Sequence, residues 1–205
     1  MTLLSKYISK QFANPSGINS RVVMSVMTRQ NKKQYQAVLD NINAQPTDAI
    51  LDIGFGNGYL IGMLQKYHPS KICGIEISQY MLDKVSRKYR QAVSTGTLDL
   101  RLANIKALPF DDACFDKICT INTLYFWNDT DSSFAEIKRT LKPDGIFINV
   151  FYGKGFLDKM SHAQYGYSKY SVEQVVEMTE KSGLKIVRVI EIQPEISHCI
   201  IAEKR

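Results

Sequence analysis

The sequence predicts a doubly wound α/β domain, in which a mostly parallel sheet of seven strands carries helices on both faces. Strand-like and helix-like stretches alternate from residue 49 to residue 151, which is the pattern of successive βα units. A glycine cluster at residues 54–58 follows the first of these strands. The last two strand-like stretches are joined by a turn at residues 193–195, and they predict an antiparallel hairpin at the end of the sheet.

The seven expected strands are short apolar or alternating runs bounded by turn residues. They are Ala49–Ile53, Lys71–Ile77, Leu98–Ala103, Phe115–Ile121, Gly145–Phe151, Leu184–Ile192 and Ile196–Glu203. The expected helices are Tyr59–Tyr67, Gln79–Val93, one from Asp131 or Ser132 to about Leu141, and Ser171–Lys181. Ser78 is a good amino-terminal cap for the second helix, and Lys142–Gly145 has the residue order of a turn.

The amino-terminal segment differs from the rest of the chain in charge. Residues 1–45 contain six basic residues and one acidic residue, so they carry +5 of the net charge of +6. Apolar residues at helical spacing within 18–27 and 35–42 predict one or two amphipathic helices. We therefore divide the chain into a helical lid, residues 1–45, and an α/β domain, residues 46–205. The basic excess suits a solvated surface, an anionic substrate or an acidic membrane surface.

Composition narrows the class of protein. No apolar run reaches the roughly 18–20 residues that a membrane-spanning helix needs, and the first residues lack the apolar core of a signal peptide. The expectation is a cytoplasmic protein. The four cysteines form no Cys-x-x-Cys pair, and no Cys/His cluster has zinc-ligand spacing, so the sequence predicts no metal site.

The glycine cluster is the strongest functional motif. Glycines after a strand let the backbone turn sharply and approach a ligand closely, but dinucleotide-binding folds share this feature. Two details favour a different ligand: Tyr59 stands where the dinucleotide fingerprint needs a third glycine, and Asp52 would repel a pyrophosphate but attract an ammonium group. Glu76, about twenty residues beyond the cluster, can accept hydrogen bonds from ribose hydroxyls.

Together, the segments ILDIGFGNG, GIEIS, LANIKALPFDDACFDKI and LKPDG resemble the class I S-adenosylmethionine-dependent methyltransferases. The resemblance covers roughly residues 47 to 151 and is nearest the small-molecule group that includes quinone-biosynthesis enzymes. It implies a Rossmann-like fold with S-adenosylmethionine as cofactor and S-adenosylhomocysteine as product. It also implies a cofactor site made of Asp52, Gly54, Phe55, Gly56, Gly58, Glu76, Ile77, Asn104, Ile105 and Asn122.

Within that implied site, the resemblance gives the positions separate roles. Asp52 and the glycines would hold the methionine moiety, and Glu76 would bind the ribose hydroxyls. Ile77 and Ile105 would contact the adenine. Asn104 departs from the aspartate that many relatives carry, although its side-chain carbonyl oxygen can still accept a hydrogen bond from the adenine amino group.

The acceptor side is predicted from the residues that follow the fourth strand and from a long aromatic insertion. Asn122 would line the junction of cofactor and substrate, and it is followed by Thr-Leu-Tyr rather than the Pro-Pro-Tyr of nucleobase methyltransferases, which disfavours a nucleic-acid substrate. The expected acceptor is a small molecule, anionic or apolar. The candidate substrate contacts are Tyr125, Trp127, Tyr152 and Tyr165. Tyr125 and His162 are the candidate catalytic bases, and residues 152–170 are expected to form part of the lid.

Several alternatives stay open at this level. The aromatic residues 125–127 either form a substrate wall or pack beneath the next helix. A nicotinamide-dependent oxidoreductase is a second enzyme class, which Tyr59, Asp52 and the lack of a separate substrate domain disfavour. A non-catalytic cofactor-binding module that contacts anionic membranes through its basic amino-terminal segment is a third reading. The methylated atom and the oligomeric state are left open.

Overall fold

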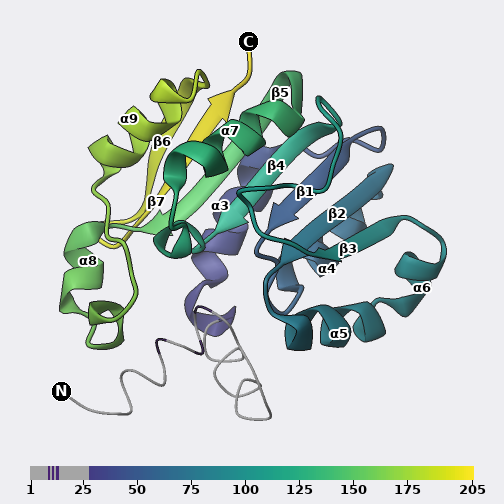
Figure 1. Ribbon diagram of the computed structural model, residues 1–205, viewed down its shortest axis with the longest axis horizontal. Helices are drawn as coiled ribbons and strands as arrows, with labels where there is room; N and C mark the ends of the chain where they lie inside the picture. Colours follow the sequence, from purple (N-terminus) through teal and green to yellow (C-terminus); the bar gives the residue numbers. More distant parts are fainter. Residues whose placement is uncertain (1–8, 10, 12, 14–27) are drawn as a thin grey trace.

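The computed structural model describes residues 9, 11, 13 and 28–205, and a seven-stranded sheet with the order β3-β2-β1-β4-β5-β7-β6 dominates this part of the chain (Figure 1). The strands are β1 Ala49–Ile53, β2 Lys71–Glu76, β3 Leu98–Leu102, β4 Phe115–Ile121, β5 Leu141–Tyr152, β6 Lys185–Gln193 and β7 Ser197–Glu203. The first five strands are parallel, whereas β7 is antiparallel to both β5 and β6. The predicted sheet with its closing hairpin is therefore confirmed.

Helices cover both faces of this sheet, which is why most of its central strands are continuous apolar runs. The helical elements are α3 Lys32–Ile42, α4 Tyr59–Leu64, η1 Gln65–Tyr67, α5 Gln79–Lys88, α6 Arg90–Ser94, η2 Leu124–Phe126, α7 Thr130–Thr140, α8 Lys154–Lys159, η3 His162–Gln164 and α9 Val172–Lys181. Helices α3, α4 and α5 bury Val38, Leu64 and Val85 on one face. On the other face, α7 and α9 bury Phe134 and Val175 (Figure 1).

The amino-terminal helix of residues 35–42 is present as α3, and it packs its apolar side on the sheet. Val38 and Ile42 are buried in the same cluster as residues of β1 and β5. The apolar positions within 18–27 lie outside the described residues. The boundary that we predict between residues 45 and 46 thus follows a helix that is packed against the α/β domain.

The helix expected at residues 79–93 is interrupted at Tyr89, where α5 ends and α6 begins. The side chain of Tyr89 turns toward the glycine loop, and its hydroxyl donates a hydrogen bond of 2.9 Å to the carbonyl oxygen of Gly58. This tertiary contact accompanies the break, although residues 79–93 read as one helix in the sequence.

The turn expected at Lys142–Gly145 is a bulge inside β5 rather than the segment before the strand. Leu141 is already paired with Phe115, and the regular register resumes where Ile146 pairs with Lys117. The bulged residues are held by the carboxyl-terminal segment, because Asp144 donates its N–H to the carbonyl oxygen of Lys204. The strand thus begins four residues earlier than the sequence predicts.

The strand order creates the crevice in which the site lies. From β1 the chain moves outward to β2 and β3, and it then returns to the other side of β1 with β4. Connections on the two sides of β1 therefore diverge, and the carboxyl ends of β1 and β4 flank an opening. In doubly wound sheets this switch point is where ligands bind.

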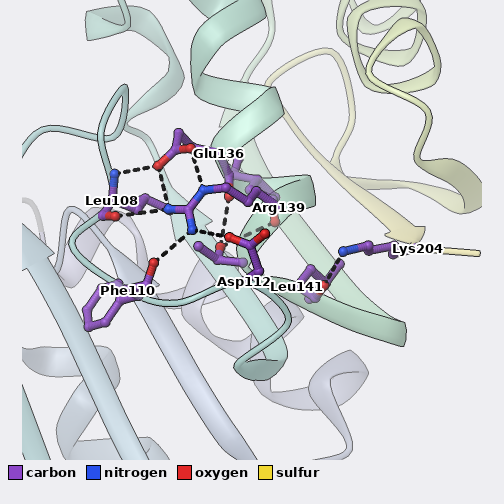
Figure 2. A network of polar contacts seen from close by, with 9 residues as sticks. Leu108, Phe110, Asp112, Glu136, Arg139, Leu141 and Lys204 are labelled. Atoms are coloured by element: carbon purple, nitrogen blue, oxygen red, sulfur yellow. Dashed lines mark hydrogen bonds and ion pairs between the residues drawn. The ribbon is translucent and has the colours of Figure 1, made fainter.

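A network around Arg139 of α7 fixes the loop between β3 and β4, which forms one wall of that opening (Figure 2). The guanidinium donates to the carbonyl oxygens of Leu108 and Phe110 at 3.0 and 2.8 Å. It also pairs with the carboxylates of Glu136 and Asp112, both at 2.7 Å. Glu136 in turn accepts the N–H of Leu108 at 2.7 Å. One planar side chain therefore holds both ends of a loop segment against α7.

We expect Arg139→Met to lower the free energy of unfolding by about 2–4 kcal/mol, because it removes the donor of a partly buried carboxylate and of two carbonyl oxygens. Urea denaturation followed by circular dichroism measures this loss. Lys181→Met is the control, because it breaks the Lys181–Asp131 ion pair, in which both side chains are 68% exposed. Such a pair contributes under about 1 kcal/mol, so equal losses in the two variants would contradict the proposed role of Arg139.

Candidate active site

A cleft opens at the carboxyl ends of β1, β2 and β4. It contains about 1100 Å³ of empty space, counted out to its open mouth. Nine of the ten residues predicted to bind the cofactor line it: Asp52, Gly54, Phe55, Gly56, Glu76, Ile77, Asn104, Ile105 and Asn122. The tenth, Gly58, lies behind the loop as the residue that precedes α4. The structure thus brings together side chains that are up to 70 positions apart in the sequence.

Asp52 is the most unusual residue of the cleft. Its side chain is 3% exposed, and Oδ2 has no hydrogen-bond partner among the described residues. Burial raises the pKa of this carboxyl to about 7, and the nearby charge of Glu76 adds to the rise. A buried carboxylate oxygen is unfavourable unless a donor or a cation meets it. This position therefore suits a ligand that brings an ammonium group or an N–H group.

Glu76 is the last residue of β2, and its carboxylate forms a hydrogen bond with the glycine loop. Its Oε2 accepts the N–H of Gly56 at 3.0 Å, and its Oε1 accepts the N–H groups of Ile77 and Ser78 at 2.8 and 3.0 Å. Burial raises the pKa of Glu76, and these three donors partly offset that rise. A carboxylate has about four lone-pair sites, so Glu76 can accept about one further hydrogen bond from a ligand in the cleft.

Two glycines of the loop are required by its shape. Gly54 has φ +72°, and a Cβ atom there would lie 2.4 Å from Cγ2 of Thr123. Gly58 has φ +68°, and a Cβ atom there would lie 2.6 Å from a methyl group of Val85 in α5. The backbone conformation disfavours any side chain at either position. Gly58 thus allows α4 and α5 to pack closely, whereas Gly54 lines the cleft itself.

The wall opposite the glycine loop is mixed in character. Ile77 and Ile105 both line the cleft, and they are 47% and 7% exposed. Asn104 is exposed, and its Oδ1 accepts the N–H of Lys106 at 3.1 Å. Trp127, which we expected at the substrate, lines this same cleft and packs edge to face on Phe134 at 5.6 Å. Both isoleucines present apolar surface to the cleft.

A second, smaller pocket adjoins the cleft, and the two share Asn31, Asn122 and Phe126. It has about 430 Å³ of empty space. Its lining consists of Gln30, Asn31, Asn122, Tyr125, Phe126, Tyr152, Leu157, Met160, His162 and Tyr167. Tyr125, Tyr152 and His162 are therefore placed where the sequence analysis expects an acceptor. Tyr165 is not among the described residues that line either hollow, and its carbonyl oxygen accepts a hydrogen bond from the hydroxyl of Ser9.

A chain of hydrogen bonds runs along the junction of the two hollows. Asn122, with φ +59°, accepts the hydroxyl of Tyr125 at 2.9 Å and donates Nδ2 to Oε1 of Gln34 at 2.6 Å. The Tyr125 hydroxyl also accepts the N–H of Tyr152, whose own hydroxyl donates to Oδ1 of Asn31 at 2.7 Å. Burial raises the pKa of Tyr125 well above its usual value. These contacts suit a positioning role for Tyr125 better than proton transfer.

Asn31, Gln34 and Tyr35 were not among the site residues predicted from the sequence. Gln34 is fully buried although it is polar, and it lies one helical turn before Val38 on the buried side of α3. A polar residue on the apolar stripe of a helix is the signal that could have identified it. Tyr35 lines the cleft, and its ring packs at 4.8 Å from that of Tyr59.

Other features of the described residues bear on the class of chemistry. In this part of the chain, no group of three or more His, Cys, Asp or Glu side chains is placed to hold a metal ion. Each of the four cysteines is a free thiol. Of the helices that the structure describes, none has the length and hydrophobicity to span a membrane.

Comparison with known proteins identifies relatives of the chain. Residues 51–149 match a family described as a methyltransferase domain. An O-methyltransferase of Pyrenophora dematioidea is 24% identical over 176 residues, which are 82% of this chain and 66% of that protein. An uncharacterized methyltransferase of Bacillus subtilis is 29% identical over 121 residues, which are 58% of this chain and 65% of that protein. The chain thus spans just under two thirds of the length of both curated relatives.

The fold has counterparts among solved structures. Geranyl diphosphate C-methyltransferase from Streptomyces coelicolor, in complex with Mg²⁺, geranyl diphosphate and S-adenosyl-L-homocysteine, matches with a TM-score of 0.78. The match covers 100% of this chain and 99% of that one at 14% identity, so it shows a common Rossmann-like fold. Residues 51–149, just under half of the chain, thus match a methyltransferase domain, and the described part of the chain has the Rossmann-like fold of a solved C-methyltransferase.

Proposed function

We propose that the protein is an enzyme that transfers a methyl group from S-adenosylmethionine to a small-molecule acceptor. The observation that supports this most directly is the unpartnered, buried Oδ2 of Asp52 at the cleft. A nicotinamide dinucleotide would bring a pyrophosphate to the glycine loop, where the Asp52 carboxylate would repel it. An amino-acid ammonium group would instead satisfy that oxygen.

The residues of the cleft fit the parts of this cofactor. Asp52 and the glycine loop suit the methionine moiety, and Glu76 retains a site for a ribose hydroxyl. The apolar side chains of Ile77 and Ile105, which both line the cleft, suit the adenine ring. When bound, the cofactor supplies an activated methyl group. The protein then has to align the acceptor and exclude water, which can contribute roughly 7–11 kcal/mol to lowering the barrier.

His162 is the better-placed proton acceptor of the two candidates. It lines the second pocket, and partial burial lowers the pKa of its imidazole, which keeps the ring neutral at pH 7. Tyr125 could act as a base only as a phenolate, which its raised pKa disfavours. We propose that His162 takes the proton when the acceptor group is protonated and that Tyr125 holds Asn122 in place.

We also propose that residues 1–45 and 152–170 together form the lid predicted from the sequence. Three contacts support this proposal: Ala13 lines the cleft, Ser9 donates to the carbonyl oxygen of Tyr165, and Asn31 lines both hollows. The two segments also touch beside the second pocket, where Tyr152 donates a hydrogen bond to Asn31, although they are distant in the chain.

Substitution of Asp52 tests the cofactor site. Asp52→Asn is expected to weaken the binding of S-adenosylhomocysteine by roughly ten- to a hundredfold, because a charged hydrogen bond contributes about 1.5–3 kcal/mol. Isothermal titration calorimetry measures the affinity. Asp48→Asn is the matched control, since Asp48 is also buried, at 7% exposed, and lies just before the opposite end of β1. Unchanged affinity in Asp52→Asn, or an equal loss in the control, would refute the assignment.

The same carboxyl predicts how binding depends on pH. With its pKa near 7, Asp52 in the free protein holds a proton at lower pH, and a cationic ligand must displace that proton. We expect the affinity for S-adenosylhomocysteine to fall by up to tenfold per pH unit below 7 and to level off above it. Calorimetric titrations from pH 5.5 to 8 check this. A profile of the same shape in Asp52→Asn would assign the dependence to another group.

The His162 proposal has a direct spectroscopic test. Burial predicts a pKa below the ordinary value of about 6.5 for this imidazole in the free protein. An NMR pH titration of the three histidines, assigned with a His162→Gln variant, measures it. A pKa at or above 6.5 would mean that the ring is partly charged at neutral pH, contrary to its proposed role.

Accessibility of Trp127, the only tryptophan of the chain, tests the lid. Trp127 is 5% exposed at the cleft wall. If residues 1–13 cover the cleft, deleting them is expected to increase quenching of Trp127 fluorescence by acrylamide in the presence of S-adenosylhomocysteine. Equal quenching in the deleted and full-length proteins would argue against a lid, provided that both bind the ligand.

A further inference from the structure

The second pocket has one wall built from apolar and aromatic side chains. Leu157 and Met160 come from α8 and the residue after it, and Tyr167 comes from the loop that follows. The Tyr167 ring stacks on Tyr125 at 5.5 Å with 22° between the planes, and it meets Phe126 edge to face at 4.7 Å. Rings that pack against one another in this way form a preformed, flat wall.

Several polar residues line the second pocket, and two of them also line the cofactor cleft. Asn31 and Asn122 belong to both hollows, so their amides lie where an acceptor would meet the methyl donor. Gln30 adds a third amide, and His162 is neutral at pH 7 for the reason given above. Amide groups donate and accept hydrogen bonds without carrying charge. The reacting end of the pocket is thus polar but uncharged.

Three charged side chains of the same segment pair with one another, and none of them lines the pocket. Lys154 and Lys169 both pair with Asp158, at 2.9 and 3.0 Å. Of the residues from 28 to 205, none of those that line the pocket is Lys, Arg, Asp or Glu. An anion that entered from water would lose its hydration against these apolar walls and meet no opposite charge on them.

We infer that this pocket binds an acceptor with a flat, apolar body whose methyl-accepting end is an uncharged hydrogen-bonding group such as a hydroxyl. The inference rests on the proposed function and deepens it, because both an anionic and an apolar acceptor were compatible with the sequence. The aromatic wall selects the body, and the amides of Asn31 and Asn122 orient the reacting group toward the cofactor cleft.

Two matched pairs of probes test the inference on the full-length protein. The aromatic pair is 2-naphthol and 2-naphthyl phosphate, and the flexible pair is 1-octanol and octyl phosphate. With saturating S-adenosylhomocysteine and with MgCl₂ present or absent, calorimetry is expected to give 2-naphthol at least a tenfold lower Kd than its phosphate and a lower Kd than 1-octanol. Tighter binding of either phosphate than of its alcohol, or no binding of 2-naphthol up to its solubility limit, would overturn the inference.

A substitution at Met160 tests whether the preference for 2-naphthol over 2-naphthyl phosphate arises in this pocket. Met160→Lys places a cation on the apolar wall and is expected to weaken 2-naphthol at least fivefold while strengthening 2-naphthyl phosphate. Met160→Leu, which conserves volume, is expected to leave both affinities within about twofold. Identical affinities in all three proteins would place the probes elsewhere and refute the inference.

Binding of S-adenosylhomocysteine alone distinguishes a failure of the acceptor inference from a failure of the proposed methyltransferase function. If the protein and both Met160 variants bind it but no alcohol binds, the acceptor inference fails and the proposed methyltransferase function stands. If wild-type protein fails to bind S-adenosylhomocysteine, the proposed function itself fails, whatever the probes do. Thermal unfolding of the variants shows that each is folded before either conclusion is drawn.

Discussion

Burial of two carboxyl groups, Asp52 and Glu76, at the ends of adjacent parallel strands is the constraint on which the rest of the site depends. Two buried acids in proximity favour one proton between them unless donors or cations intervene. Glu76 is supplied with three backbone donors, whereas Oδ2 of Asp52 has none among the described residues. The glycine loop therefore bends so that the N–H of Gly56 reaches the Glu76 carboxylate. The Oδ2 atom of Asp52 is then available to accept a hydrogen bond from a ligand.

That bend determines the surrounding structure. A loop tight enough to bring Gly56 to Glu76 passes through positive φ angles, and the side chain of Thr123 leaves no space for a Cβ atom at Gly54. The loop ends in α4, which the hydroxyl of Tyr89 ties to α5 through the carbonyl oxygen of Gly58. On the opposite wall, the network of Arg139 fixes the loop after β3 (Figure 2). The loops on both sides of the cleft are thus held by contacts among residues that do not line it, namely Tyr89 with Gly58 and Arg139 with Leu108 and Phe110.

The parts of this structure that were predictable from the sequence are those encoded by local pattern. The strands of the sheet, the glycine loop and the closing hairpin are contiguous runs with turn residues between them, so hydrophobic periodicity and turn chemistry identify them. The break at Tyr89 and the bulge at residues 142–145 depend on partners that are distant in the sequence, namely Gly58 and Lys204. For the same reason, the placement of Trp127 at the cofactor cleft could not be read from its position after β4.

Gln34 shows most clearly why the acceptor side was harder to predict than the cofactor side. The cofactor residues follow strand ends in order, whereas the junction needs a helix that precedes the whole sheet. Gln34 of α3 and Tyr125 each form a hydrogen bond with the side-chain amide of Asn122 and so help to orient it. Since Asn122 lines both hollows, a shift of α3 would alter the cleft and the second pocket together. Helix α3 is therefore a structural part of the site. If residues 1–45 cover the cleft, α3 is the part of that segment that also connects the cleft with the second pocket.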